Sequence, residues 1–193
     1  VQHLQIIKKT PPSKEPFKFF PLSLPVTLRF DQAQVHNLDI ITAPGKRVRL
    51  DDILLNDALW RGDRITIHNS SLLLPALRLT GVDAQMTFRD HWPIHGTGQL
   101  AVSALTRQNL QPVALRVQGP LDQLAVQGES RWPDPLQLRG QVRPLDPGVP
   151  YVARLQWQNY HWPVVAAQQL YSRQGEAELS GTLDGLSAQV STD

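Results

Sequence analysis

Proline is the residue that most constrains what this chain can fold into. Sixteen prolines are spread over its 193 residues. A proline inside a helix removes a backbone hydrogen bond and clashes with the preceding turn, so few windows remain in which a helix of ordinary length could run. Helix therefore cannot dominate this fold, and strands are the expected element.

The spacing of the apolar residues predicts strands directly. Through much of the chain one residue in two is apolar, a period that gives a strand one dry face and one wet face. The clearest runs hold Val26, Leu28 and Phe30; Ile65 and Ile67; Val82, Ala84, Met86 and Phe88; Val113, Leu115 and Val117; and Ala153, Leu155 and Trp157. We therefore expect an all-β fold whose dry faces lie on one side of a sheet.

Turn sequences separate these runs at intervals of roughly ten residues, which indicates hairpins and a mostly antiparallel sheet. The segments rich in Gly, Pro and Asp that favour turns lie at 43–45, 61–63, 119–120, 132–135, 146–148 and 184–185.

Three segments are less regular than the rest. Residues 1–20 read as an extended lead-in rich in Lys and Pro, with Leu4–Ile7 as its candidate strand. Residues 51–59 fit a short helix as well as a strand, and residues 164–171 fit a helical turn or an irregular strand. We expect residues 21–193 to form a single β-rich groove domain. Because no Met begins the chain, we expect it to be a fragment of a longer protein.

Charge argues against a nucleic-acid partner. The formal net charge is +2, and the first 20 residues contribute +3 of it, from Lys8, Lys9, Lys14 and Lys18 against Glu15. The rest of the chain therefore sums to about −1, with arginines scattered among aspartates rather than gathered in a basic stripe. The chain also has no cysteine, which excludes disulfides and thiolate chemistry.

No enzymatic or metal site is expected from the motifs. His91 and His95 would point to one face of a strand, but only Asp90 could serve as a third ligand. Glu176 and Glu178 share a strand face, and solvation explains them. The sequence contains no nucleophile elbow and no phosphate-binding glycine loop. We therefore expect no catalytic residue, no metal and no cofactor.

Five tryptophans keep a binding module open as an alternative. They lie at positions 60, 92, 132, 157 and 162. Such side chains could stack on sugars, yet three of them precede proline, where an aromatic ring anchors a turn onto a sheet. A carbohydrate-binding β module is therefore the weaker reading.

Parts of the chain resemble a known family. VALRVQG at 113–119, LQWQNYHWP at 155–163 and GEAELSG at 175–181 are similar to the amino-terminal part of the TamB family, within the AsmA-like group. FPLSLP at 20–25, followed by VTLRF, is similar to the proline-rich entry into that region. The likeness is strongest over residues 112–190. These motifs are structural, so they identify no active residue.

The resemblance implies the periplasmic part of an inner-membrane-anchored protein, a β-rich open trough of the β-taco kind with an apolar inside. It also implies phospholipid transport toward the outer membrane and, with a TamA-like partner, outer-membrane protein assembly. An apolar concave face could shelter acyl chains, at about 0.8 kcal/mol per buried methylene. About 14 strands spaced at about 4.8 Å would make a trough roughly 65 Å long.

The predicted lipid-binding groove takes one apolar residue in two from successive strands. Its residues are Leu28, Phe30, Leu38, Ile40, Ile65, Ile67, Leu77, Leu79, Met86, Phe88, Leu100, Val102, Leu115, Val117, Leu124, Val126, Leu136, Leu138, Leu155, Trp157 and Leu179. Pro75 interrupts residues 72–79, so a bulge or an edge is expected there. The sequence leaves two questions open: whether this face is an open groove or a sealed core, and whether it serves lipids or receives strands as a scaffold.

Overall fold

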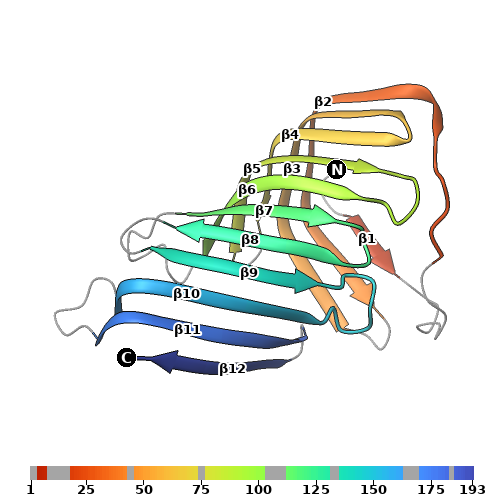
Figure 1. The fold of residues 1–193 in the computed structure, drawn as a ribbon. Helices are drawn as coiled ribbons and strands as arrows, with labels where there is room; N and C mark the ends of the chain where they lie inside the picture. The colour runs from red at the N-terminus through yellow and green to blue at the C-terminus, as the bar shows by residue number, and fades with distance from the viewer. Residues whose placement is uncertain are drawn as a thin grey trace.

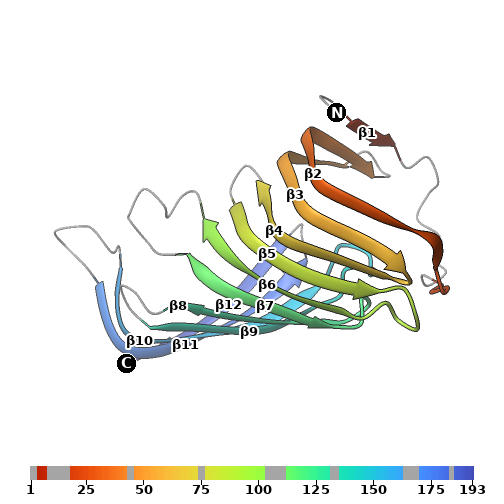
Figure 2. The ribbon, with the colours of Figure 1, turned by 90° about the horizontal axis from the view of Figure 1, so that it is seen from above.

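The protein is a single twisted β-sheet that bends into an open trough (Figures 1 and 2). The computed structural model describes residues 4–7, 18–42, 46–73, 77–102, 112–130, 135–162, 170–182 and 185–193. Their twelve strands lie in the sheet in the order in which they occur in the chain. All neighbouring strands are antiparallel except the first two, which are parallel. The all-β, mostly antiparallel architecture is therefore confirmed.

The strand bounds follow the predicted turns closely. The strands are β1 (Leu4–Ile7), β2 (Leu24–Thr42), β3 (Lys46–Gly62), β4 (Arg64–Leu73), β5 (Leu77–Thr87), β6 (Ile94–Val102), β7 (Val113–Gly119), β8 (Leu124–Ser130), β9 (Leu136–Val142), β10 (Tyr151–Trp162), β11 (Leu170–Thr182) and β12 (Gly185–Thr192). The described ranges contain no helix, and so none that could cross a membrane.

Several sequence-based expectations change at this point. Residues 51–59 are not a helix but the middle of β3, since Ile53 pairs with Val35 on one side and Leu72 on the other. Residues 72–79 are not one interrupted strand either: β4 ends at Leu73 and β5 begins at Leu77. Strands β2 and β3 are longer than expected, so twelve strands are described rather than about 14. The strand predicted at Leu4–Ile7 is confirmed, while residues 163–169 lie outside the described part.

A line of bulges bends the long strands. Asp57 on β3, Asn69 on β4 and Gly81 on β5 have φ values of 42°, 45° and 57°, and the pairing register shifts beside each of them. Asn, Asp and Gly are the residues that adopt this left-handed conformation most readily, and a bulge increases strand bending. The buried hydroxyl of Ser70 supports the bend, because its Oγ accepts the backbone N–H of Asn56 at 3.1 Å.

No second layer covers the sheet. Among the described side chains only Ala58, Phe88 and Ala177 count as buried hydrophobic residues, and no large side chain is completely buried. A sandwich of this size would hide many more, since two packed sheets bury their inner faces. The apolar face is therefore an open surface along which neighbouring side chains pack sideways.

One glycine on this face allows a tryptophan to lie flat against the sheet. A Cβ at Gly175 would lie 2.6 Å from Cε2 of Trp157 and 2.9 Å from the carbonyl oxygen of Ser191. The indole is fixed further by its N–H, which donates to Oγ of Ser172 at 2.9 Å. The Trp157 ring thus takes the place of a side chain at position 175.

Gly175→Ala is expected to destabilise the protein by about 1–3 kcal/mol, the usual cost of overpacking. Gly98→Ala is the matched control, because a Cβ there would meet Leu79 and Val82 at an ordinary 3.4 Å, and the lost backbone freedom of the unfolded chain offsets any small strain. Urea denaturation monitored by circular dichroism measures both. Equal midpoints for the two variants would contradict the assigned position of the indole.

Candidate functional site

The apolar face is organised in rows that cross the strands. The first row takes one residue from each of β2 to β12, and its successive members are Cα partners except for Gly119 and Leu124, which flank the β7–β8 connection. It consists of Leu28, Trp60, Ile65, Met86, Ile94, Gly119, Leu124, Val142, Tyr151, Gly181 and Leu186.

Two further rows run beside the first and widen the apolar face. The second holds Ile67, Ala84, Gly96, Val117, Val126, Gly140, Ala153, Leu179 and Ala188. The third holds Gly98, Leu115, Gly128, Leu138, Leu155, Ala177 and Val190. Side chains directly opposite each other in a ladder share a face, so each row lies on one side of the sheet. Successive rows are two residues apart along a strand, so all three rows lie on the same side.

A fourth row lies beyond the third and combines apolar with polar residues. Its apolar members on β2 to β7 are Val35, Ile53, Leu72, Leu79, Leu100 and Val113. It continues through Ser130, Leu136, Trp157, Gly175 and Thr192. The four rows contain no charged residue, so this surface has no group of opposite charge that could stabilise a charged ligand removed from water.

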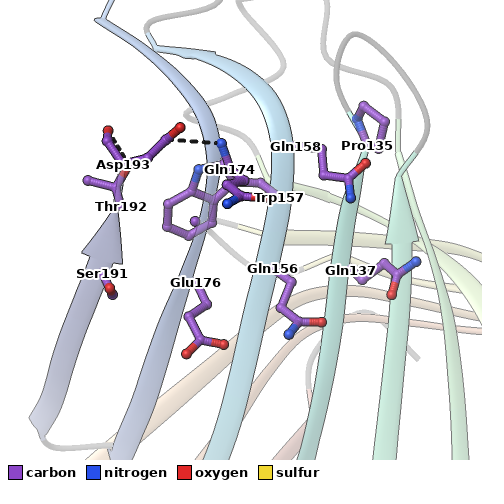
Figure 3. Close-up of a pocket in the computed structure, with 11 residues that line it drawn as sticks. Pro135, Gln137, Gln156, Trp157, Gln158, Gln174, Glu176, Ser191, Thr192 and Asp193 are labelled. Carbon is purple, nitrogen blue, oxygen red and sulfur yellow. Dashed lines mark hydrogen bonds between the residues drawn. The ribbon is translucent and has the colours of Figure 1, made fainter.

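The other side of the sheet is polar. On β7 the residues of the rows are half-buried, while Ala114, Arg116 and Gln118 between them are exposed. On β9 to β11 the partners Gln137, Gln156 and Glu176 line a hollow of about 540 Å³ (Figure 3). This polar face keeps the sheet hydrated, and near the end of the sheet Trp157, Gly175 and Thr192 of the fourth row line the same hollow.

An ion pair on the polar face shows its electrostatic character. Nη2 of Arg154 donates to Oε1 of Glu178 at 2.6 Å, across β10 and β11, and both side chains are more than half exposed. This hydrogen bond, with the nearby charges of Glu176 and Glu178, raises the pKa of Arg154. The pair belongs to the solvated face, as expected from the alternation of Glu176 and Glu178.

The apolar face stays exposed where the sheet ends. On β12, Leu186 and Val190 are 65% and 61% exposed, and on β2 Leu28 and Phe30 are 38% and 48% exposed. Contiguous apolar surface of this extent on a folded protein marks a site of interaction with another apolar group. The face is thus an open groove that runs the length of the described sheet.

Most of the predicted groove residues lie together on this face. Phe30 pairs with Ala58 next to the first row. For Leu38, Ile40, Leu77 and Val102 only the pairing is described: Leu38 lies opposite Leu50, Ile40 opposite Val48, and Leu77 opposite Val102. Sequence reasoning missed Trp60, Ile94, Tyr151 and Leu186, each of which adjoins a turn. They can be recognised only from the pairing register, which places each of them opposite another residue of the first row.

Phe88 is the exception among the predicted groove residues. Strand β5 ends at Thr87, and the Phe88 side chain is only 6% exposed. Its ring lies 5.0 Å from that of Trp60 and 5.1 Å from that of Trp92, centroid to centroid. The rings of Phe19 and Phe20 also contact that of Trp92. We call these five residues the aromatic cluster.

The aromatic cluster joins neighbouring turns along one edge of the trough. We call this edge the turn rim; its described connections are 61–64, 88–93, 120–123 and 143–150. Phe88 donates its backbone N–H to Asp63 at 2.7 Å and accepts that of Leu22 at 3.1 Å. The indole N–H of Trp92 donates to the carbonyl oxygen of Phe20 at 3.0 Å. Trp92 thus anchors a turn, as the Trp-Pro pairs predicted.

The two histidines do not form a joint site. His91 lies in the turn after β5, where its Nδ1 is 2.7 Å from Oδ2 of Asp122, whereas His95 lies on β6 opposite Gln118. In the part of the chain that the structure describes, no three His, Asp or Glu side chains gather as metal ligands.

The fold and its surface define a class of protein: a single-layered β trough with one charge-free apolar face and one polar face. The family described as TamB, N-terminal domain, matches residues 3–193, and the chain belongs to this family. No curated protein and no solved structure matches it.

Proposed function

We propose that this chain shelters the acyl chains of phospholipids in its trough. In this proposal it is the periplasmic part of an inner-membrane-anchored protein that carries phospholipid toward the outer membrane and contributes to outer-membrane biogenesis. The observation that carries the proposal is the continuity of the first row, which crosses β2 to β12 without a charged residue. Acyl chains suit such a surface because the transfer of apolar groups from water drives their binding.

Membership of the TamB family supports the same function from another direction. In our proposal a TamA-like protein of the outer membrane is the partner of the full-length protein. The chain itself contributes the lipid-sheltering surface and no chemistry. The groove-lining residues are those of the sequence prediction that lie in the four rows, while Phe88 contributes to the stability of the turn rim instead.

Site-specific photocrosslinking tests the groove directly. A photoreactive phenylalanine analogue at Leu155 would face the apolar rows, whereas the same analogue at the adjacent Gln156 would face the polar side. We expect irradiation in membranes to attach phospholipid at position 155 and not at position 156, with mass spectrometry as the readout. Equal labelling at both positions, or no lipid at position 155, would exclude the groove as the lipid path.

A second candidate function, a scaffold that receives strands, is favoured by the sheet edge at β12. Strand β12 pairs with β11 in an unbroken register and contains no Pro and no charged residue. Proline and charged residues block strand addition at the edges of natural sheets. At the other end of the sheet β1 pairs with β2 only over residues 38–41, and the rest of β2 has Pro25, Arg29 and Asp31. Slow hydrogen exchange along β12 only in the presence of an unfolded outer-membrane protein would support this candidate.

A further inference from the structure

The apolar face has few side-chain N–H or hydroxyl groups, and nearly all of them are engaged within the protein. In the four rows these groups belong to Trp60, Ser130, Tyr151, Trp157 and Thr192. The indole of Trp60 donates to the carbonyl oxygen of Gly62 at 3.1 Å, and that of Trp157 donates to Oγ of Ser172 at 2.9 Å. Oγ1 of Thr192 lies 2.6 Å from the same Oγ of Ser172, and Ser130 has a partner as well.

Tyr151 is the exception. Its hydroxyl makes no hydrogen bond in the part of the chain that the structure describes, although the side chain is half-buried. Tyrosine hydroxyls that leave the solvent normally find a hydrogen-bond partner. Water can satisfy this hydroxyl as long as the groove is empty, but a ligand lying against the ring displaces water. Such a ligand binds well only if it replaces the lost hydrogen bond.

Tyr151 lies at the margin of the groove. It is the first residue of β10 and follows the 143–150 connection of the turn rim. Its partners in the first row are Val142 and Gly181, and Gly181 has no side chain that could cover the ring. Farther from this rim, the second and third rows contain no polar side chain. A ligand here meets one hydroxyl at the margin and only apolar groups beyond it.

This order of groups fits the carbonyl of a lipid ester better than a phosphate. The four rows contain no charged residue, and in the adjoining connection Arg143 is already paired with Asp146 at 3.2 Å. A phosphate drawn onto the apolar face would therefore lose its hydration without gaining a counter-charge. An ester carbonyl is neutral, accepts a hydrogen bond and is joined directly to the acyl chain. The head group beyond it stays in water.

We propose that the hydroxyl of Tyr151 donates a hydrogen bond to an ester carbonyl oxygen of a lipid whose acyl chain lies over the second and third rows. This inference rests on the proposed function. It specifies an ester-linked lipid as the cargo, and it places the polar end of that lipid at the turn rim. Tyr151 is then a residue that determines specificity, because it distinguishes an acyl ester from an ether of the same length.

The test uses the whole chain and a substitution that removes only the hydroxyl, Tyr151→Phe. The matched control is Tyr171→Phe, which also removes a hydroxyl, but one that lies outside the four rows and donates to Oδ1 of Asn159 at 2.9 Å. Each protein is mixed with vesicles of dioleoylphosphatidylcholine, or of its diether analogue, which has the same head group and tails without carbonyls. Mass spectrometry quantifies the lipid that stays with the protein. Sodium oleate serves as a third ligand.

We expect Tyr151→Phe to capture the diester lipid about three- to tenfold less well than wild type, the usual effect of one lost neutral hydrogen bond. Capture of the diether lipid and of oleate should be the same for both proteins, and Tyr171→Phe should behave as wild type with all three ligands. The melting temperature of Tyr151→Phe should be unchanged, since no hydrogen bond within the protein is lost. In infrared spectra of bound lipid with labelled carbonyls, the hydrogen-bonded carbonyl band should disappear in this variant.

The other outcomes separate the groove from the tyrosine contact. If wild type captures neither phospholipid, the groove proposal itself fails. If wild type and Tyr151→Phe capture the diester lipid equally, the groove stands and the contact is overturned. Equal losses of the diester and the diether lipid would show that the hydroxyl does not bind the carbonyl. If the substitution weakens capture of oleate as much as that of the diester, the hydroxyl binds the carboxylate of a free fatty acid and the assigned lipid class is wrong.

Discussion

Leu138→Asp is expected to abolish lipid capture while the sheet stays folded. Leu138 lies in the third row between Gly128 and Leu155, and it is half-buried. A carboxylate there can reach water because nothing covers the face, so we expect a loss of about 1–2 kcal/mol and a melting temperature lower by roughly 2–8 °C. An acyl chain passing the same point would have to desolvate that charge. Thermal denaturation and photocrosslinking to lipid measure the two effects.

Val152→Asp is the matched control for this prediction. Val152 lies on β10 between Tyr151 of the first row and Ala153 of the second, but on the polar face, where it is 54% exposed. The same new charge there should leave lipid capture at the wild-type level. Leu115→Arg, two strands away in the third row, should reproduce the loss with the opposite charge. Outright unfolding of both groove variants would mean that the face is a sealed core.

Phe88→Ala is expected to cause the largest loss of stability, about 3–5 kcal/mol. Phe88 is one of the few buried side chains of the described structure, and its ring contacts those of Trp60 and Trp92. Truncation would leave a cavity where the 61–64 and 88–93 connections of the turn rim meet the segment before β2. Urea denaturation at equilibrium provides the measurement, with the slope checked for two-state behaviour.

The control for the cluster is Phe20→Ala. Phe20 contacts Trp92 at 5.5 Å between centroids, but its side chain is 52% exposed. Its truncation should cost about 1 kcal/mol, the usual value of one aromatic contact. Equal destabilisation by the two substitutions would show that burial of Phe88 is not what holds the rim together.

The placement of Phe88 marks one limit of sequence reasoning. The alternation Val82, Ala84, Met86, Phe88 is unbroken in the sequence, and it predicts all four on the groove face. The structure ends the strand one residue earlier, at Thr87, and Phe88 is buried in the aromatic cluster while its backbone bonds to Asp63 and Leu22. Both partners are distant in the chain, and no local pattern contains them.

The bend of the sheet marks a second limit. Residues 51–59 are ambiguous because DDILLNDAL carries apolar residues at helical as well as strand spacing. The long strands β2 and β4 decide the matter by pairing with both edges of β3. Where Asp57, Asn69 and Gly81 align on three neighbouring strands, their left-handed conformations together bend the trough. Any one of them alone would read as an ordinary turn residue.

By itself the sequence determined that this protein is a sheet with one apolar and one polar face, because a period of two is a local property that each strand carries independently. It also determined the order of the strands, since short turns allow only neighbours to pair. Only the tertiary structure decided that no second layer covers the apolar face and that the bulges at Asp57, Asn69 and Gly81 lie on neighbouring strands. Cover and the alignment of the bulges depend on how the strands bend and register together, and those are properties of the whole sheet.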